Sequence, residues 1–273
     1  MWDMAQLEGR MRALSNEPRT PRPAPHLTEA ERERIHTVRK IEPVYLDKYS
    51  LFLSQKNTGI FKLFPDIGCV SKIVVSISDA CARFVPLSSS FTFRTNNYSD
   101  EVYHDIYFKD EQIISNSFFS QGVFVAVGDE PIENIDLSHA ALKYLDSFQP
   151  AVDTPSAIEH AKAFNEGVEA NGYRYVDHFS PKENQTYFMR MLAYRLGNTM
   201  RPITNDTPMS EMMFHSLALD KRVDIVVLFR ILNRDENSGL TIVWKELSRA
   251  EAGKIKFAKN EPRKDFRPDL RHH

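Results

Sequence analysis

The chain has 273 residues, of which 42% are hydrophobic and 11% aromatic, enough for one large domain or two small ones with a real core. Its formal net charge of -2 at pH 7 argues against a broad nucleic-acid-binding surface, because such affinity comes largely from clustered Lys and Arg. No stretch approaches the roughly 20 apolar residues that a membrane-spanning helix needs, so we expect no membrane span.

The first residues do not resemble an export signal. Residues 1–22 lack the apolar core, roughly 7 to 15 residues long, that a secretory signal carries. We therefore expect a cytoplasmic protein, and the alternative is an exported protein whose signal is missing from this sequence. Prolines interleaved with arginines up to Pro25 favour extended backbone, so residues 1–26 are predicted to be a disordered arm.

Two helices are predicted after the arm. Thr28 and Glu31 fit a capping box, in which each side chain satisfies a backbone amide at the start of a helix. This helix should run to about Ile41. Pro43 can open a second helix, which should end near Gly59. The apolar stripes of both helices are typical of a face that packs on a sheet.

The middle of the chain has the alternation of an antiparallel sheet. Aromatic and β-branched residues recur every second position between residues 91 and 128, with polar turns between them. Within residues 102–109, the even-numbered side chains should face one side of a strand and the odd-numbered ones the other. Turns after this strand predict a three-strand meander with further strands at 113–119 and 123–127.

The two cysteines, Cys69 and Cys81, flank another predicted strand at residues 72–78. They cannot form a zinc site by themselves and do not make a CxxC pair. An extended strand would separate them by roughly 20 Å at about 3.3 Å per residue. Buried free thiols are therefore the simpler expectation, and a disulfide would require the chain to fold back sharply; the sequence leaves this pairing open.

An acidic turn follows the predicted meander, with Asp129, Glu130, Glu133 and Asp136 close together. These side chains are hard oxygen donors of the kind that calcium requires. The alternating ligands and central glycine of an EF-hand are missing, however, and Asp136 fits the N-cap of a helix that reaches Phe148. We predict a solvated turn here, with no metal site and no cofactor.

The next predicted helix starts at Thr154 and Pro155, as N-cap and first helical residue, and stops at Gly172. Strands are then expected at 173–179 and 186–196, joined as a hairpin.

A nearly unbroken apolar run at residues 222–234 is typical of a central strand that is covered on both faces. A turn at 235–239 should return the chain into a strand at 240–247, which carries Trp244. Residues 207–217 can form a helix within a less regular segment.

The fold class that follows is α+β, with antiparallel β-hairpins forming a sheet or open sandwich, covered by the N-terminal and middle helices. We expect a single domain at residues 27–252. Residues 253–273 are rich in Lys and Arg and poor in apolar side chains, which predicts a basic mobile tail. A doubly wound topology is disfavoured, because parallel neighbours need long crossover connections.

The usual catalytic signatures are absent from the sequence: no nucleophile elbow, P-loop, dinucleotide fingerprint or zinc helix. The remaining candidates are His104 with Asp105, and Asp177 with His178. An imidazole and a carboxylate together can run acid/base chemistry or hold a metal. Because neighbours on a strand point to opposite faces, an active site would need the two strands side by side in matching phase.

Four tyrosines are candidates for a ligand-binding surface: Tyr103, Tyr107, Tyr173 and Tyr175. Their rings combine an apolar face with a polar hydroxyl. The leading functional hypothesis is a non-catalytic binding or interaction protein whose exposed sheet aromatics bind an unknown protein or small ligand. The alternative is a hydrolase or metal-dependent enzyme with a spatially assembled His/Asp site. The sequence specifies neither the ligand nor the oligomeric state.

Overall fold

The protein is described here from a computed structural model, in which residues 28–71, 74–75, 81, 84–99, 103–196, 222–236 and 238–258 are described. The predicted N-terminal arm, the helix at 207–217 and most of the C-terminal tail lie outside these residues. The chain divides between Val38 and Arg39 into two compact units. No helix within the described ranges is both long and apolar enough to cross a membrane.

The described part of the first unit is helix α2 (Glu29–Val38). The backbone N–H of Thr28 donates to Oε2 of Glu31 (2.7 Å), and the backbone N–H of Glu31 donates to Oγ1 of Thr28 (3.3 Å). These reciprocal bonds satisfy two amides that have no partner inside the helix. The predicted capping box is confirmed, although the helix ends three residues before the expected Ile41. That this helix covers the sheet stays a prediction.

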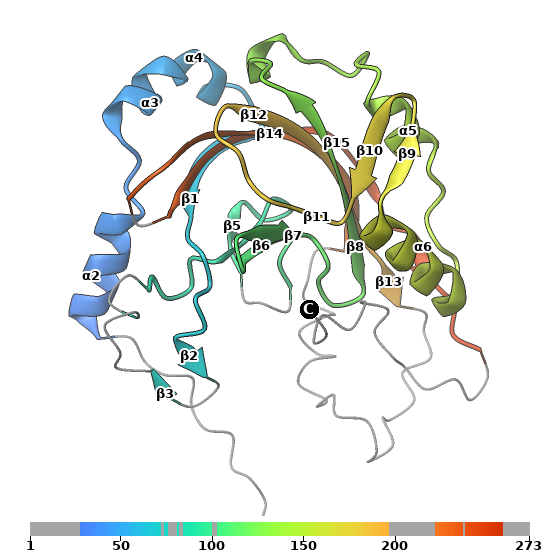
Figure 1. Ribbon diagram of the computed structural model, residues 1–273, viewed down its shortest axis with the longest axis horizontal. Coiled ribbons are helices and arrows are strands. Elements are labelled where there is room, and N and C mark those ends of the chain that lie inside the picture. Colours follow the sequence, from blue (N-terminus) through green and yellow to red (C-terminus); the bar gives the residue numbers. More distant parts are fainter. Residues whose placement is uncertain are drawn as a thin grey trace, which may run out of the picture. The chain divides into compact units, whose positions relative to one another are not determined.

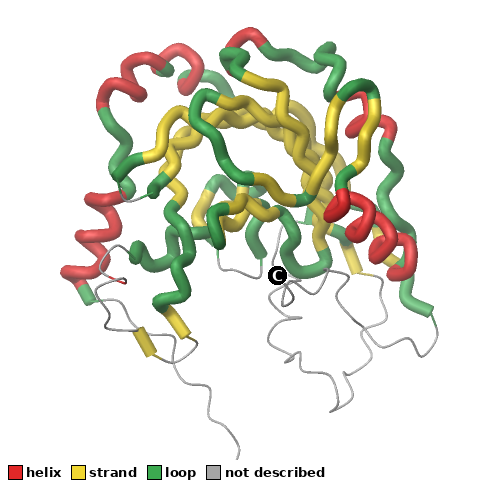
Figure 2. Tube along the Cα trace, in the orientation of Figure 1, coloured by secondary structure: helices red, strands yellow, loops and turns green. Residues whose placement is uncertain are grey.

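Two antiparallel sheets form the framework of the second unit. The seven-stranded sheet A has the order β1-β15-β14-β12-β8-β10-β9, and the five-stranded sheet B has the order β11-β7-β6-β4-β5. Within this unit sheet A curves over sheet B (Figures 1 and 2). The predicted α+β class with antiparallel sheets is confirmed.

The strands of sheet A are β1 (Thr58–Leu63), β8 (Ser120–Gly128), β9 (Val168–Ala170), β10 (Tyr173–Val176), β12 (Gln185–Ala193), β14 (Val223–Arg234) and β15 (Leu240–Glu251). Those of sheet B are β4 (Ser90–Thr92), β5 (Asn97–Tyr98), β6 (Ile106–Lys109), β7 (Gln112–Ile114) and β11 (His178–Phe179). Two short pairs complete the strands, β2 (Val70–Ser71) with β3 (Val74–Val75), and β13 (Arg195–Leu196) with β16 (Lys254–Ile255). The helices of this unit are α3 (Pro43–Lys48), α4 (Ser50–Leu53), the 3-10 turn η2 (Ile132–Asn134), α5 (Leu142–Ser147) and α6 (Thr154–Glu166).

Sheet A has a hydrophobic core on each face. Rings and aliphatic side chains from β1, β8, β12, β14 and β15 pack against those of β4, β6 and β7, which fills the space between the sheets. On the other face, buried side chains of α4, α5 and α6, such as Phe52, Leu145 and Phe164, share a second core with β8, β12 and β14. Strands that are buried on both faces carry continuous apolar runs, and β14 is the clearest case.

The hairpin of β14 and β15 agrees with the sequence. The two strands pair antiparallel, with Phe229 opposite Trp244. In the turn, the backbone N–H of Asp235 donates to the carbonyl of Gly239, and the backbone N–H of Gly239 donates to the Asp235 carboxylate, both at 2.8 Å. The predicted central strand, its turn and its partner strand are confirmed.

The predicted meander is wrong in its third strand. β6 and β7 form a hairpin in sheet B, but β8 lies in sheet A between β12 and β10. The change of sheet follows from burial: Phe124 packs in the core between the sheets, whereas Val123 and Val125 pack in the core beneath the helices. A strand with two apolar faces is stable only where both faces are covered. Phe119, with φ of 48°, lies where the chain turns into β8.

The hairpin predicted between residues 173–179 and 186–196 is also wrong. β10 pairs with β8 and β9, β11 pairs with β7 of sheet B, and β12 pairs with β8 and β14. Asp177, between β10 and β11, marks the point where the chain crosses from one sheet to the other.

Three helix boundaries differ from the prediction, and of the two helix starts only that of α6 has a side-chain cap. Asp136 accepts hydrogen bonds from the backbone and hydroxyl of Ser138 in a local turn, and α5 starts only at Leu142. The N-cap of α6 is Asp153 rather than Thr154. Its helix stops at Gly167, not at Gly172, which lies in the turn between β9 and β10.

The region after Gly253 begins as ordered structure. Lys254 and Ile255 form β16, which pairs parallel with β13, and Ile255 is buried. The remaining division of the chain into an arm, a domain and a tail stays a prediction.

Cys69 and Cys81 form a disulfide, with their Cα atoms 5.6 Å apart. Of the strand predicted at 72–78, only Val74 and Val75 lie within the described residues, as β3, and they pair antiparallel with β2. The expected separation of the cysteines therefore does not arise, and free thiols were the wrong expectation.

We expect no free thiol in the oxidised protein. Alkylation of the unfolded chain without reductant should leave both cysteines unmodified, and prior reduction should expose both. Because the bridge closes a loop of 12 residues, Cys69→Ser should lower the free energy of unfolding by about 2–3 kcal/mol in oxidising buffer and change nothing in reducing buffer. Labelling of both cysteines before reduction would contradict the bridge.

Candidate functional site

The first predicted acid/base pair, His104 and Asp105, precedes β6 and is not part of a strand. The Asp105 carboxylate is buried and accepts hydrogen bonds from Nε of Arg94 (2.6 Å) and from the backbone N–H of Arg94 (3.0 Å). His104 is also buried, and its ring centroid lies 5.3 Å from that of Tyr107. Asp105 thus acts as the counter-ion of Arg94, a role that no local sequence pattern predicts.

The second pair, Asp177 and His178, is better placed for chemistry. The buried Asp177 carboxylate accepts from Nδ2 of Asn116 (2.5 Å) and lies 2.6 Å from Nδ1 of His178. The side chain of His178 is 32% exposed. Its hydrogen bond with Asp177 outweighs the effect of burial and raises the pKa of His178.

His178 lies in one row of sheet B with Tyr107, whose ring contacts that of His104. His178 lies opposite Ile114, and Ile114 lies opposite Tyr107, so these three side chains share one face of the sheet. The Tyr107 hydroxyl donates to the carboxylate of Asp66. Two strand spacings place Tyr107 and His178 roughly 10 Å apart, with Ile114 between them. In the part of the chain that is described, no three His, Cys, Asp or Glu side chains cluster as metal ligands.

The His178 imidazole should titrate at a higher pH than an ordinary histidine. A raised folded-state pKa means that the stabilisation by the Asp177 contact is complete below the unfolded pKa, roughly 6.5, and is lost as pH rises through the folded value. An NMR titration of the ring protons should show this, and Asp177→Asn should return the pKa toward 6.5. An unchanged titration in Asp177→Asn would show that the contact is not the cause.

The four tyrosines do not form one surface. Tyr175 is fully buried, its hydroxyl donates to the carbonyl of Ala141 (2.8 Å), and burial raises its pKa to about 12. Tyr173 packs beside the core under the helices, Tyr103 beside a third core that contains Phe118, and Tyr107 lies on sheet B. The predicted alternation fails because residues 103–105 are not in a strand, so the expected aromatic face is not assembled.

The acidic turn serves as an anchor for a buried arginine. Arg230 donates to the carboxylate of Asp129 and to the carbonyl of Glu130 (2.9 Å). The turn therefore fixes the end of β8 against β14.

A site that no local sequence pattern predicts lies at the end of the inter-sheet core, beside Phe93 and Trp244. We call it the polar groove, a cavity of about 560 Å³. Its lining residues come from the start of β1, the β4–β5 turn and β15: Asn57, Thr58, Phe93, Arg94, Thr95, Asn96, Trp244, Glu246 and Arg249.

The asparagines of the polar groove sit on fixed turns. Asn57 has φ of 58° and Asn96 has φ of 51°, a left-handed conformation that Asn adopts more readily than most residues. The carbonyl of Asn57 accepts the backbone N–H of Glu246 (2.8 Å). These turns place Asn57 on the β1 side of the groove and Asn96 on the β4–β5 side.

The base of the polar groove is aromatic but closed. The ring centroids of Trp244 and Phe93 are 5.2 Å apart, and the two residues are only 3% and 1% exposed. A Cβ atom on Gly59 would lie 2.5 Å from Nε1 of Trp244. Glycine at this position thus permits the indole to pack directly on β1.

The charges of the polar groove are paired. Arg249 binds both carboxylate oxygens of Glu246, at 2.9 and 2.5 Å, and donates to the carbonyl of Arg94 (3.2 Å). The hydrogen bond with Glu246 raises the pKa of Arg249. Arg94 is itself neutralised by Asp105.

A β-bulge explains why this cluster could not be found by alternation. Glu246 lies opposite Val227, but Ser248 lies opposite Val226, which leaves Leu247 as the extra residue. The bulge shifts the phase of β15 by one residue. Arg249 therefore shares a face with Trp244 and Glu246, whereas strict alternation would place it on the opposite side.

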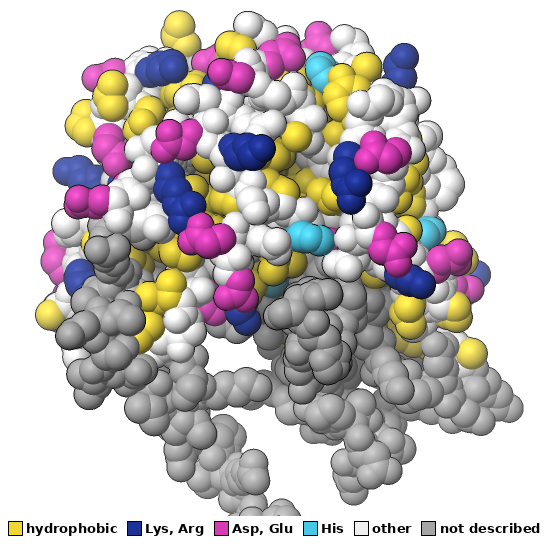
Figure 3. All heavy atoms as spheres, viewed as in Figure 1, with side chains coloured by type: hydrophobic (Ala, Val, Ile, Leu, Met, Phe, Trp, Pro, Cys, Tyr) yellow, Lys and Arg dark blue, Asp and Glu magenta, His cyan; other side chains and the backbone are white. Residues whose placement is uncertain are grey.

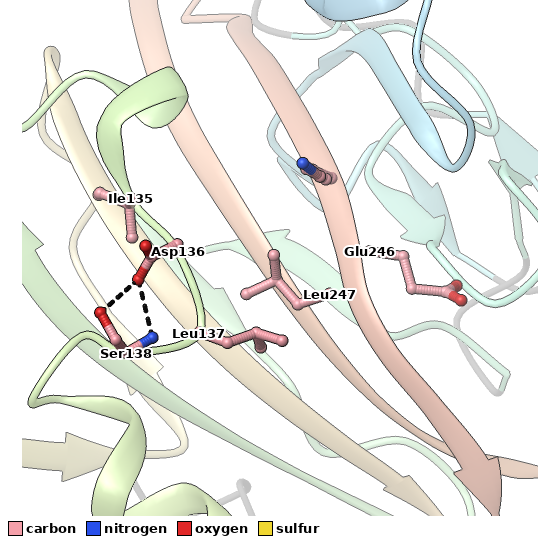
Figure 4. Close-up of a pocket in the computed structure, with 7 residues that line it drawn as sticks. Ile135, Asp136, Leu137, Ser138, Glu246 and Leu247 are labelled. Atoms are coloured by element: carbon pink, nitrogen blue, oxygen red, sulfur yellow. Dashed lines mark hydrogen bonds between the residues drawn. The ribbon is translucent and has the colours of Figure 1, made fainter.

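A second cavity, of about 460 Å³, lies on the other side of β15. In Figure 4 the side chains of Leu137 and Leu247 approach each other across it, while the Glu246 side chain points away. Asp136 is held in its local turn by Ser138 and does not reach across the cavity. The surface of this cavity is mainly apolar, although Asp136, Ser138, Lys245 and Glu246 also line it.

The chain matched none of the protein families, curated proteins or solved structures with which it was compared. Any functional proposal therefore rests on its own residues.

Proposed function

We propose that the protein is a non-catalytic binding protein and that a small molecule binds in the polar groove. The observation that carries this proposal is the convergence of Arg249, Glu246 and two turn-fixed asparagines on one cavity of about 560 Å³. Ligand sites are typically concave, roughly 300–1,000 Å³ in volume, and contain a few polar groups that fix orientation.

Preorganisation supports this use of the groove. The Glu246–Arg249 pair, the Asn57 turn and the packed Trp244 ring are held by contacts that exist without ligand. Ordering side chains during binding costs affinity, so a site whose polar groups are already fixed loses less. A sheet-surface site built from the four tyrosines is not proposed, because those side chains point into separate regions.

A thermal-shift screen of the full chain against small molecules of positive, negative and zero charge tests the proposal. A ligand of the polar groove should raise Tm, and the double variant Asn57→Gly/Asn96→Gly should weaken its binding by about tenfold or more, through lost hydrogen bonds. Glycine retains the positive φ at both turns. Asn171→Gly is the matched control, since Asn171 has φ of 53° in the β9–β10 turn and does not line the groove.

The groove proposal fails if every stabilising compound binds the double variant as tightly as the unmodified protein. Equal weakening by Asn171→Gly would also contradict it, because the loss would then reflect turn stability and not the groove.

A second candidate function is hydrolysis, with His178 as general acid/base. It is favoured by the buried Asp177, which hydrogen-bonds to Nδ1 of His178 and is itself held by Asn116. A buried carboxylate of this kind orients an imidazole and stabilises its protonated form. The metal-dependent version of this hypothesis stays a prediction.

Hydrolysis of p-nitrophenyl acetate and p-nitrophenyl phosphate by the purified chain tests the second candidate. Activity above the buffer background should fall by about 100-fold in His178→Gln, the usual size of a general acid/base contribution. Equal rates for the original protein and His178→Gln would remove the hypothesis.

A further inference from the structure

We infer that the ligand of the polar groove is a neutral, hydroxyl-rich small molecule, of the size and chemistry of a mono- or disaccharide. This inference rests on the proposed binding function and adds the class of ligand. It follows from the balance of charge in the groove, from the mixture of hydrogen-bonding groups and from the burial of its aromatic rings.

The charge balance argues against an ionic ligand. Each arginine of the groove has its own carboxylate: Arg249 is bound by both oxygens of Glu246, and Arg94 is paired with Asp105. An anion would have to compete with Glu246 for Arg249 and would then lie beside that carboxylate. Like charges brought together in a partly desolvated site are strongly unfavourable. A cation would meet the same obstacle from the two guanidinium groups.

Charges of both signs are also mixed on the face of the molecule that is drawn in Figure 3. Lys and Arg side chains lie among Asp and Glu side chains over that face. A surface of mixed sign does not concentrate a charged ligand in the way that a single-sign cleft does.

The remaining polar groups suit hydroxyls. Each asparagine amide offers both donors and acceptors, and the Thr95 hydroxyl can act in either role. The Thr58 hydroxyl donates to the carbonyl of Gln55 (2.9 Å) and can still accept. Asn57 and Thr58 stand on the β1 side, and Thr95 and Asn96 stand on the β4–β5 side. A ligand hydroxyl also donates and accepts, so several of them can be satisfied together between these walls, whereas an anion could use the donors alone.

The aromatic rings argue against a flat ligand such as a nucleobase. Trp244 and Phe93 pack into the core between the sheets and expose almost no surface. A planar ligand gains its affinity largely by stacking on an open aromatic face. In the polar groove the rings provide an apolar edge at the base, and hydrogen bonds at the walls must supply the orientation.

Isothermal titration calorimetry of the full chain tests the ligand class. The neutral probes are glucose, N-acetylglucosamine, lactose and maltose, and the charged probes are citrate and spermidine. At least one neutral probe should bind, with a loss of about tenfold or more in Asn57→Gly/Asn96→Gly and no change in Asn171→Gly, because only the first variant removes amides that line the groove.

Glu246→Gln adds a test that depends on charge. The substitution leaves Arg249 without its carboxylate, so citrate should gain binding by about tenfold or more. The neutral probe should lose a similar factor, because the ion pair that holds this wall of the groove in place is gone. Circular dichroism and Tm of the variant establish that it is folded. Unchanged affinity for both probes in a folded Glu246→Gln protein would overturn the inference.

The outcomes separate this inference from the function on which it rests. Groove-dependent binding of citrate or spermidine by the unmodified protein, with none of the neutral probes binding, overturns the ligand class and supports small-molecule binding in the groove. Absence of groove-dependent binding by every probe here and by every compound of the thermal-shift screen overturns both.

Discussion

Asp105→Asn is expected to lower the free energy of unfolding by about 3–5 kcal/mol, the usual cost of removing one partner from a buried ion pair. Arg94 and Asp105 have side chains that are only 1% and 0% exposed. The amide of Asn retains the shape of the carboxylate but not its charge. The Arg94 guanidinium would then stay charged in a site that excludes water.

The measurement is urea unfolding followed by circular dichroism, with two comparison variants. Glu169→Gln removes the acid of the exposed pair with Arg174, whose side chains are 59% and 67% exposed, and should change stability little. The double variant Arg94→Met/Asp105→Asn should recover part of the loss, because the uncompensated charge is gone. A loss in Asp105→Asn no larger than that in Glu169→Gln would show that this pair is not buried as described.

Phe229→Ala is expected to cost about 3–5 kcal/mol, as large-to-small changes at fully packed aromatic positions do. The Phe229 ring is stacked on Tyr187, with centroids 5.3 Å apart, and lies within 6.3 Å of Phe93, Phe124 and Phe179. Removing it leaves a cavity that rings from both sheets surround, and these cannot all move inward together.

Guanidinium unfolding measures this cost. Phe229→Leu should lose less than Phe229→Ala, because the smaller cavity forfeits fewer contacts. Leu51→Ala is the comparison at a large apolar residue that is 85% exposed, and it should stay close to the original protein. A similar loss for Phe229→Ala and Leu51→Ala would show that the core between the sheets is not centred on Phe229.

Arg94 belongs to the buried ion pair and also lines the polar groove, so the stability of this pair bears on the proposed site. The Arg94 guanidinium is buried against Asp105. The residue also lines the polar groove, and its backbone carbonyl accepts a hydrogen bond from Arg249. The buried pair therefore positions one wall of the groove. In Asp105→Asn, a folded fraction should bind the neutral probe more weakly even though Asp105 is not among the lining residues.

The sequence could specify individual elements where a local pattern has one stable solution. The capping box at Thr28 and Glu31, and the β14–β15 hairpin around Asp235 and Gly239, depend on residues that lie close together in the chain. The apolar run of β14 likewise requires cover on both faces, wherever its partners come from. Candidate acid/base residues were found in the same way, since Asp177 and His178 are neighbours in the sequence.

The tertiary structure decided which strands pair and which side chains meet. Three features show this. The chain passes from sheet B to sheet A between β7 and β8, the β2–β3 reversal brings Cys69 to Cys81, and the bulge at Leu247 places Arg249 beside Glu246. The physical reason is that alternation fixes the face of a residue only while a strand is unbroken. Pairing depends on burying both faces of sheet A at once, which no local pattern encodes. The polar groove joins three segments through such pairings, and so only the assembled fold could bring its residues together.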